Sequence, residues 1–181
     1  MAAMADEDDQ ALVARARLGE GAALDALVSR HSRAVYELAY RVLGDSDLAE
    51  DAAQDAFVRA LRALKGFRGD ASFRTWLLRI ALNTARSAGR TRTRRGEVPL
   101  ELVSETLGGD ADPEREAVAR TEAARAERAL AALPEKQRLA VTLRLHQGLS
   151  HREIADLTDM SEGSARVNYH LGVKRLRELL K

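Results

Sequence analysis

The sequence contains no cysteine, and only three of its 181 residues are proline. The absence of cysteine excludes disulfide bonds, thiol catalysis and cysteine-based metal or redox sites within this chain. Aromatic residues make up only 4% of the sequence, and β-branched runs are few, whereas alanine, leucine and arginine are abundant. This composition favours helices over strands, so we predict an all-α fold.

Long apolar runs are also missing, since none approaches the ~20 residues that a membrane-spanning helix needs. The N-terminus is acidic, unlike that of a secretory signal peptide. We therefore expect a cytoplasmic protein without membrane insertion. The four histidines lack the spacing of metal ligands and have no evident carboxylate partner, and no nucleophile and base are paired in the sequence. We expect no metal site, no cofactor and no enzymatic activity. The histidines are His31, His146, His151 and His170.

The charge is segregated along the chain, although the net charge is only +1. Five arginines accumulate between residues 86 and 95 with no acidic residue among them. A block of one sign repels itself unless it meets a counter-charge, so this run favours binding to nucleic-acid phosphates over a solvated helix end. The five are Arg86, Arg90, Arg92, Arg94 and Arg95.

The segment before this run predicts a loop followed by a helix. Gly66 and Gly69 flank a short stretch that is too glycine-rich for regular structure, and Asp70 or Ser72 would cap the next helix. Apolar residues then recur at steps of three and four. They are Phe73, Trp76, Leu77, Ile80, Ala81 and Thr84. This spacing favours a core position for Trp76, although an exposed aromatic side chain here would also stack on unpaired bases.

The N-terminal third predicts three helices. A short apolar pattern from Leu12 to Leu18 precedes a stronger one over 22–43, which Gly44 ends. The third helix covers 47–64, and Asp47 with Glu50 fits a capping box. One face of this helix is acidic beyond its first turn, where the helix dipole no longer accounts for the carboxylates. That face is either a solvated surface or a docking site for a basic protein.

Residues 97–116 predict a linker, because they carry seven acidic residues against one basic residue and are interrupted by prolines and a Gly-Gly pair. Beyond it, helical periodicity resumes near Pro113, and Pro134 is placed as a first helical residue. Ser150 and Glu153 form a capping box for a short helix, 151–157. Ser161 would cap a longer helix, 162–180. This layout is typical of a helix-turn-helix, although a purely structural helical hairpin would share its caps.

Taken together, these motifs resemble the extracytoplasmic-function sigma factors of bacterial RNA polymerase over nearly the whole chain. DLAEDAAQDAFVRALRAL (47–64) is similar to the family's polymerase-docking helix, and FRGDASFRTWLLRIALNTARS (67–87) to its promoter-melting and minus-ten segment. Residues 133–179 resemble its minus-thirty-five-reading domain. The resemblance implies two small helical domains, 1–95 and 117–181, joined by an acidic flexible linker, 96–116.

The resemblance also implies function, partners and residue roles. The protein would bind core RNA polymerase and promoter DNA, direct transcription initiation, and be held by an anti-sigma factor. Residues implied to dock on the polymerase are Asp47, Glu50, Asp51, Gln54 and Phe57. Residues implied to read and melt the minus-ten element are Phe67, Arg68, Gly69, Asp70, Ser72, Trp76, Arg79, Asn83, Arg86, Arg90, Arg92, Arg94 and Arg95. Residues of the helix-turn-helix are Ser150, His151, Arg152, Ser161, Ser164, Arg166, Val167, Asn168, His170, Leu171, Lys174 and Arg175.

The last helix departs from the family pattern, which has several basic residues where this chain has Asn168, Leu171 and Val173. Arg166 is the candidate for a guanine, Asn168 for an adenine, and Val167 or Leu171 for a thymine methyl. The apolar residues are alternatively a docking surface for an inhibitory partner. There are two rival functions. One is a stand-alone helix-turn-helix regulator, and the other is an interaction protein that titrates a sigma-factor inhibitor.

Overall fold

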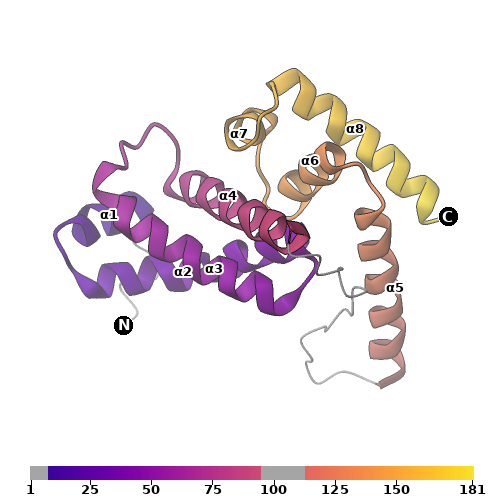
Figure 1. Cartoon of the computed structure of the whole chain (residues 1–181), viewed down its shortest axis with the longest axis horizontal. Helices are drawn as coiled ribbons and strands as arrows, with labels where there is room; N and C mark the ends of the chain where they lie inside the picture. The colour runs from indigo at the N-terminus through magenta and orange to yellow at the C-terminus, as the bar shows by residue number, and fades with distance from the viewer. Residues whose placement is uncertain (1–7, 95–112) are drawn as a thin grey trace. The chain divides into compact units, whose positions relative to one another are not determined.

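The computed structural model describes residues 8–94 and 113–181, and every regular element in these ranges is helical (Figure 1). The all-α prediction is therefore confirmed. The chain divides into two compact units, Met1–Val98 and Pro99–Lys181. The predicted linker lies outside the described residues as far as 112, and its last four residues are already helical because the next helix begins at Pro113.

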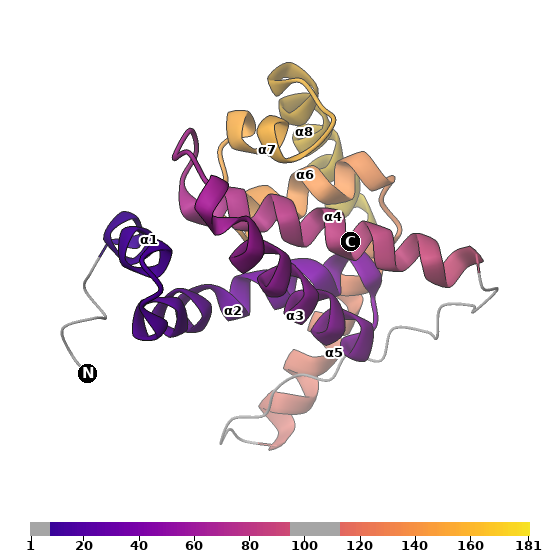
Figure 2. The ribbon, with the colours of Figure 1, turned by 60° about the vertical axis from the view of Figure 1, so that its left-hand side comes forward.

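In the described part of the first unit, residues 8–94, there are four α-helices and one short 3-10 helix. These are α1 (Asp9–Arg17), α2 (Gly21–Leu43), α3 (Ser46–Ala63), η2 (Leu64–Gly66) and α4 (Phe73–Arg94). Helices α2, α3 and α4 pack against one another, and α1 packs on α2 (Figure 2). The buried face of α3 is made of alanines, which lets its neighbours approach closely, while α2 and α4 contribute leucines such as Leu38, Leu77 and Leu82.

Local signals set three of the helix ends in this unit. Gly44 ends α2 with a φ of 68°, as predicted. Helix α3 is capped by the carboxylate of Asp45, which accepts the Leu48 amide hydrogen at 3.0 Å. The predicted Asp47–Glu50 capping box is therefore wrong, because Asp47 already lies inside the helix. Ser72, one of the two predicted caps, accepts the amide hydrogen of Thr75 at 3.0 Å at the start of α4.

The second unit contains α5 (Pro113–Ala131), α6 (Glu135–Leu145), α7 (His151–Leu157) and α8 (Glu162–Leu179). Both predicted serine caps are confirmed, including the full capping box of Ser150 and Glu153. Pro134 precedes the first residue of α6 and is its N-cap, one position from where it was predicted. Helix α8 packs against α6 and α7, so α7 and α8 form the short-helix, turn, long-helix pair that the sequence predicts.

A glycine in α8 permits its contact with α6. Gly172 is buried, and a Cβ atom at this position would lie 2.6 Å from Val141 Cγ2 and 3.3 Å from the Gln137 carbonyl oxygen. A separation of 2.6 Å is well inside van der Waals contact, so any side chain here would force the helices apart. At this point, α8 and α6 are therefore separated only by a hydrogen atom of Gly172.

Candidate functional site

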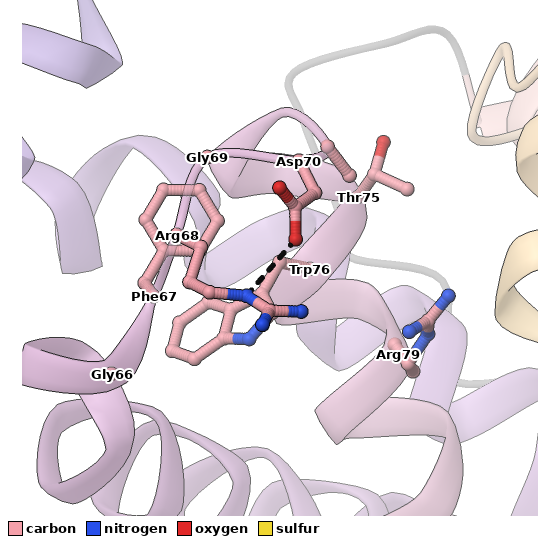
Figure 3. A pocket seen from close by; sticks show the side chains of 9 residues that line it. Gly66, Phe67, Arg68, Gly69, Asp70, Thr75, Trp76 and Arg79 are labelled. Carbon is pink, nitrogen blue, oxygen red and sulfur yellow. Dashed lines mark hydrogen bonds and ion pairs between the residues drawn. The ribbon is translucent and has the colours of Figure 1, made fainter.

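A pocket of about 420 Å³ lies at the beginning of α4, next to the glycine-containing loop (Figure 3). The loop residues 66–71 form one side of this pocket, and Thr75, Trp76 and Arg79 of α4 form the other. Gly69 has a φ of +79°, a conformation that other residues rarely adopt, so glycine is required for this turn. We call residues 66–71 the pocket loop.

An aromatic cluster of Phe67, Phe73 and Trp76 packs at the pocket. The ring of Trp76 lies 5.0 Å from that of Phe67 and 5.7 Å from that of Phe73, centroid to centroid, and Phe67 meets Phe73 edge to face. Both phenylalanines are buried, whereas Trp76 is half-buried and lines the pocket. Trp76 therefore packs on the core, as its spacing predicts, and also faces the pocket. Phe67 also lines the pocket, although most of its side chain is buried in this cluster.

Charged side chains surround the mouth of this pocket. Arg68 donates from Nε to Asp70 Oδ2 at 3.1 Å, and both side chains are largely exposed (Figure 3). An exposed ion pair contributes little stability, so a ligand can separate it at small cost. Arg79 is exposed one turn further along α4. The pocket thus combines an aromatic surface with guanidinium groups, which suits an unstacked base and its phosphates.

The basic run continues along α4 beyond the pocket. Asn83 and Arg90 are exposed, and Arg86 is half-buried. Arg92 differs from the expectation of an open phosphate ligand: its side chain is only 14% exposed, and its Nη1 lies 3.1 Å from Asp45 Oδ2. Arg92 therefore ties α4 to the residue that caps α3. The side chain of Arg94 and the whole of Arg95 lie outside the described residues.

The acidic side chains of α3 gather on one exposed face. Asp47, Glu50, Asp51 and Gln54 are exposed there, and Phe57 is half-buried. Gln54 donates from Nε2 to Glu50 Oε1, one helical turn earlier, at 3.4 Å. A groove of about 380 Å³ runs between α3 and α4 beside this face. Its lining residues are Leu48, Asp51, Ala52, Asp55, Arg59, Thr84, Ser87, Ala88, Thr91 and Arg92. We call the exposed residues 47, 50, 51 and 54 the acidic face.

His31 corrects the expectation that no histidine has a carboxylate partner. It is buried in α2, its Nε2 lies 2.8 Å from Asp9 Oδ2, and its ring packs 5.5 Å from Phe73. Because a carboxylate only accepts, the neutral imidazole donates from Nε2. No local sequence pattern predicts this pair, because the rest of α1 and the first part of α2 lie between the two residues. Burial lowers the pKa of His31, because the charged ring would lose its hydration, while the Asp9 carboxylate opposes this shift.

The N-terminal unit should lose stability as the pH falls below the ordinary histidine pKa of about 6.5, since the unfolded chain then binds a proton that the folded chain binds less readily. Asp9, Arg30 and Arg74 are the charged groups that face His31. Urea midpoints followed by Trp76 fluorescence should decrease from pH 7.5 to pH 5.5, and His31→Gln should reduce this decrease. An equal decrease in the variant would assign the pH dependence to other groups.

Apart from the half-buried His151, the predicted helix-turn-helix residues divide into two groups. Ser150 and Ser161 are used as helix caps, and Asn168 donates from Nδ2 to the Ser164 carbonyl oxygen at 2.8 Å, which holds it beside its own helix. The other group is exposed on α7 and α8. Its members are Arg152, Arg166, Val167, His170, Leu171, Lys174 and Arg175.

Val167 and Leu171 are 56% and 49% exposed, so neither belongs to the core of this unit. Arg166 pairs with Glu162 one turn earlier, at 3.3 Å on the surface. His151 is half-buried and packs 5.6 Å from the Tyr169 ring, which places it beside the outer face of α8. The exposed surface of α8 therefore mixes the cations Arg166, Lys174 and Arg175 with two apolar side chains.

Within residues 8–94 and 113–181, no group of three or more potential ligands is arranged to hold a metal ion. None of the helices in these ranges has the length and apolar content of a membrane span.

Two family models match the chain. Residues 27–95 match Sigma-70 region 2, and residues 123–176 match Sigma-70, region 4. The sequence is 38% identical over 171 residues to the RNA polymerase sigma-H factor of Pseudomonas aeruginosa, covering 90% of this chain and 89% of that protein. It is 37% identical over 166 residues to the ECF RNA polymerase sigma-E factor of Escherichia coli K12, covering 87% and 86%.

Solved structures with a similar fold were also found. CnrH, in complex with the cytosolic domain of CnrY, is 27% identical with a TM-score of 0.71, over 96% of this chain and 97% of CnrH. The sigma factor RpoE of Bartonella quintana, in complex with the anti-sigma factor NepR, is 22% identical with a TM-score of 0.71, over 86% of this chain and 95% of RpoE. At that identity, the RpoE likeness concerns the fold alone.

Proposed function

This chain belongs to the extracytoplasmic-function sigma factors of bacterial RNA polymerase, and from this premise we propose which of its surfaces perform each step of transcription initiation. As an alternative sigma factor it binds core RNA polymerase and directs promoter-specific initiation. It is an initiation factor, and we propose that it has no catalytic activity of its own. A stand-alone helix-turn-helix regulator would leave the match of residues 27–95 to Sigma-70 region 2 without a role.

The acidic face of α3 is the proposed docking surface for core polymerase. The observation that carries this proposal is the exposure of Asp47, Glu50, Asp51 and Gln54 on one side of the helix, away from its buried alanines. Carboxylates beyond the first helical turn gain little from the dipole, so a basic partner is the better explanation for them. Phe57, half-buried one turn later, would support the edge of this surface.

Co-elution with core RNA polymerase tests this surface. We expect the wild-type chain to co-elute and the Asp51→Arg, Gln54→Ala variant to be absent from the complex, because a reversed charge at an interface repels a basic partner. The matched control is Asp25→Arg, Gln10→Ala, which makes the same changes at exposed positions of α2 and α1.

The possible results separate the function from the choice of surface. Failure of both variants to co-elute would point to a general charge effect rather than a docking face. Co-elution of all three proteins would keep the function and reject the acidic face. Failure of the wild-type chain to bind would contradict the assignment as a sigma factor.

The pocket beside Trp76 is the proposed site for a base from the non-template strand. A base that leaves the duplex must exchange its stacking for another aromatic contact, and the pocket provides one next to exposed arginines. Capturing a base that opens spontaneously requires no nucleotide hydrolysis. Asn83, Arg86 and Arg90 continue along α4 and are proposed to follow the opened strand.

The outer face of α8 is the proposed reader of the upstream promoter element. Arg166 is proposed to make a bidentate contact to a guanine, and Val167 and Leu171 to contact thymine methyl groups. Asn168 is a weaker candidate for an adenine than its residue type suggests, because its amide is bonded to Ser164. Lys174 and Arg175 are proposed to contact phosphates at the far end of the helix.

An anti-sigma factor is the proposed partner that holds this chain inactive. The likeness to CnrH, which is solved in complex with the cytosolic domain of CnrY, supports a protein partner here. The exposed Val167 and Leu171 are the alternative surface for such a partner. We propose that this chain is located in the cytoplasm, since core polymerase and promoter DNA are there.

A further inference from the structure

The geometry points to Arg17 as a positioning residue that holds the pocket loop in the shape that accepts a base. Arg17 is the last residue of α1, far from the pocket loop in sequence. The inference concerns the same pocket and rests on its proposed role in promoter opening. It goes beyond that role by naming the residue that keeps the pocket formed before DNA arrives.

Arg17 bonds to the backbone where α3 ends and the pocket loop begins. Its Nε donates to the Leu64 carbonyl oxygen at 3.1 Å, and its Nη2 donates to the carbonyl oxygens of Lys65, at 3.2 Å, and Phe67. The last carbonyl groups of a helix have no partner within the helix. A guanidinium group carries several donors in one rigid plane, so a single side chain bonds to all three carbonyls and fixes their relative positions, although the Leu64 carbonyl also accepts the Phe67 amide hydrogen at 3.1 Å.

The opposite end of the pocket loop is also connected to α1. Asp9, the first residue of α1, accepts from His31, and His31 packs against Phe73, the first residue of α4. Helix α1 contacts both η2 and α4. The loop is thus held at its entry by Arg17 directly and at its exit by Asp9 through His31.

Within the loop itself, Phe67 packs on Phe73 and Trp76, but few contacts fix the backbone beyond it. A Cβ placed on Gly66 or Gly69 would meet nothing within 4 Å, so neither glycine is packed against another part of the protein. The Arg68–Asp70 ion pair is largely exposed. A loop of this kind samples many conformations unless its ends are fixed. A ligand that binds only one of these conformations must offset the lost conformational entropy, so its affinity is lower. The bonds from Arg17 remove this freedom in advance.

Arg15 provides a matched control on the same helix. It lies two residues earlier and bonds from Nε to Glu20 Oε2 at 2.8 Å, a partner just beyond the end of α1. Arg15→Gln and Arg17→Gln remove the same charge from the same helical turn. Only the second removes the bonds to η2 and to the first part of the pocket loop.

The first test uses the only tryptophan of the chain, Trp76, which lines the pocket and packs on Phe67. Acrylamide quenching and the emission maximum are measured on the full-length protein. We expect Arg17→Gln to shift the emission to the red and to raise the quenching constant, while Arg15→Gln matches the wild type. An unchanged Trp76 signal in Arg17→Gln overturns the inference.

The second test measures open-complex formation by the holoenzyme on a promoter that the wild-type holoenzyme selects from random DNA. A misplaced group can slow a step by about a hundredfold, so we expect a decrease of about tenfold to a hundredfold in the opening rate of Arg17→Gln, with core binding unchanged. Arg17→Lys should recover part of the rate, because an ammonium group reaches one carbonyl.

The two readouts separate the inference from the proposed function. A changed Trp76 signal with a normal opening rate would mean that Arg17 shapes the loop but the pocket takes no base, and it would reject the proposed role of the pocket. An opening rate that falls only in proportion to core binding or to the folded fraction, measured by urea unfolding, would reject a positioning role for Arg17.

Discussion

Replacing Trp76 by alanine should slow promoter opening by about tenfold to a hundredfold, since stacking of a base on an aromatic side chain contributes about 1–3 kcal/mol. Trp76 is the half-buried aromatic ring of the pocket lining, whereas Phe67, which also lines the pocket, and Phe73 are buried, so neither of these rings offers an open face to replace it. Fluorescence of 2-aminopurine in the non-template strand, measured with the holoenzyme, reports the opening rate.

Two comparisons make this result specific. Tyr36→Ala removes a half-buried ring of α2 that stacks on Tyr40, outside the pocket, and should leave the opening rate unchanged. A template with a mismatched bubble already has unpaired bases, so the deficit of Trp76→Ala should shrink on it. A deficit equal in Tyr36→Ala would indicate general destabilisation of the N-terminal unit. An opening rate untouched by Trp76→Ala would reject the pocket as the base acceptor.

Neutralising the basic run should produce the second large effect. Arg90→Gln, Arg94→Gln, Arg95→Gln together should reduce the slope of log affinity against log salt concentration by about 0.9 for each phosphate that the protein no longer neutralises. The measurement is holoenzyme binding to promoter DNA at a series of salt concentrations. A smaller slope reflects fewer counterions released from the DNA, so it distinguishes weaker phosphate binding from a disrupted fold.

Arg92→Gln is the internal control for this experiment. Because Arg92 is largely buried against Asp45, it should contribute nothing to the salt slope. Its replacement should instead lower the stability of the N-terminal unit, since Asp45 also caps α3. If the triple variant keeps the wild-type slope, the run does not contact phosphates. If Arg92→Gln alone reduces the slope, the ion pair with Asp45 opens when DNA binds.

The features that were predictable from the sequence are those that depend on near neighbours. Gly44 ends a helix because of its own backbone, and Ser150 and Glu153 form their capping box within one turn. The choice between two nearby acids was already beyond sequence reasoning: Asp45 and Asp47 both precede an apolar run, and only the path of the chain decides that Asp45 accepts the capping hydrogen bond.

The contacts that shape the pocket join distant parts of the sequence, so no local pattern indicates them. Arg17 meets η2 and the pocket loop 47 to 50 residues away, and His31 meets Asp9 across a separation of 22. The glycines and aromatic residues of the loop were visible as candidates. The half-buried position of Trp76 was not, because a helical stripe indicates which side faces inward but not where the packed layer ends.

The close approach of Gly172 to Val141 has a consequence for how promoter preference can change. This contact fixes how closely α8 packs on α6, because only a hydrogen atom of Gly172 separates the two helices there. Val167 and Leu171 lie on the exposed side and do not share in this packing. If α8 reads the upstream element as proposed, substitutions on its outer side should alter which bases are preferred without changing how α8 packs on α6. The promoter preference would then be adjustable independently of the fold that presents it.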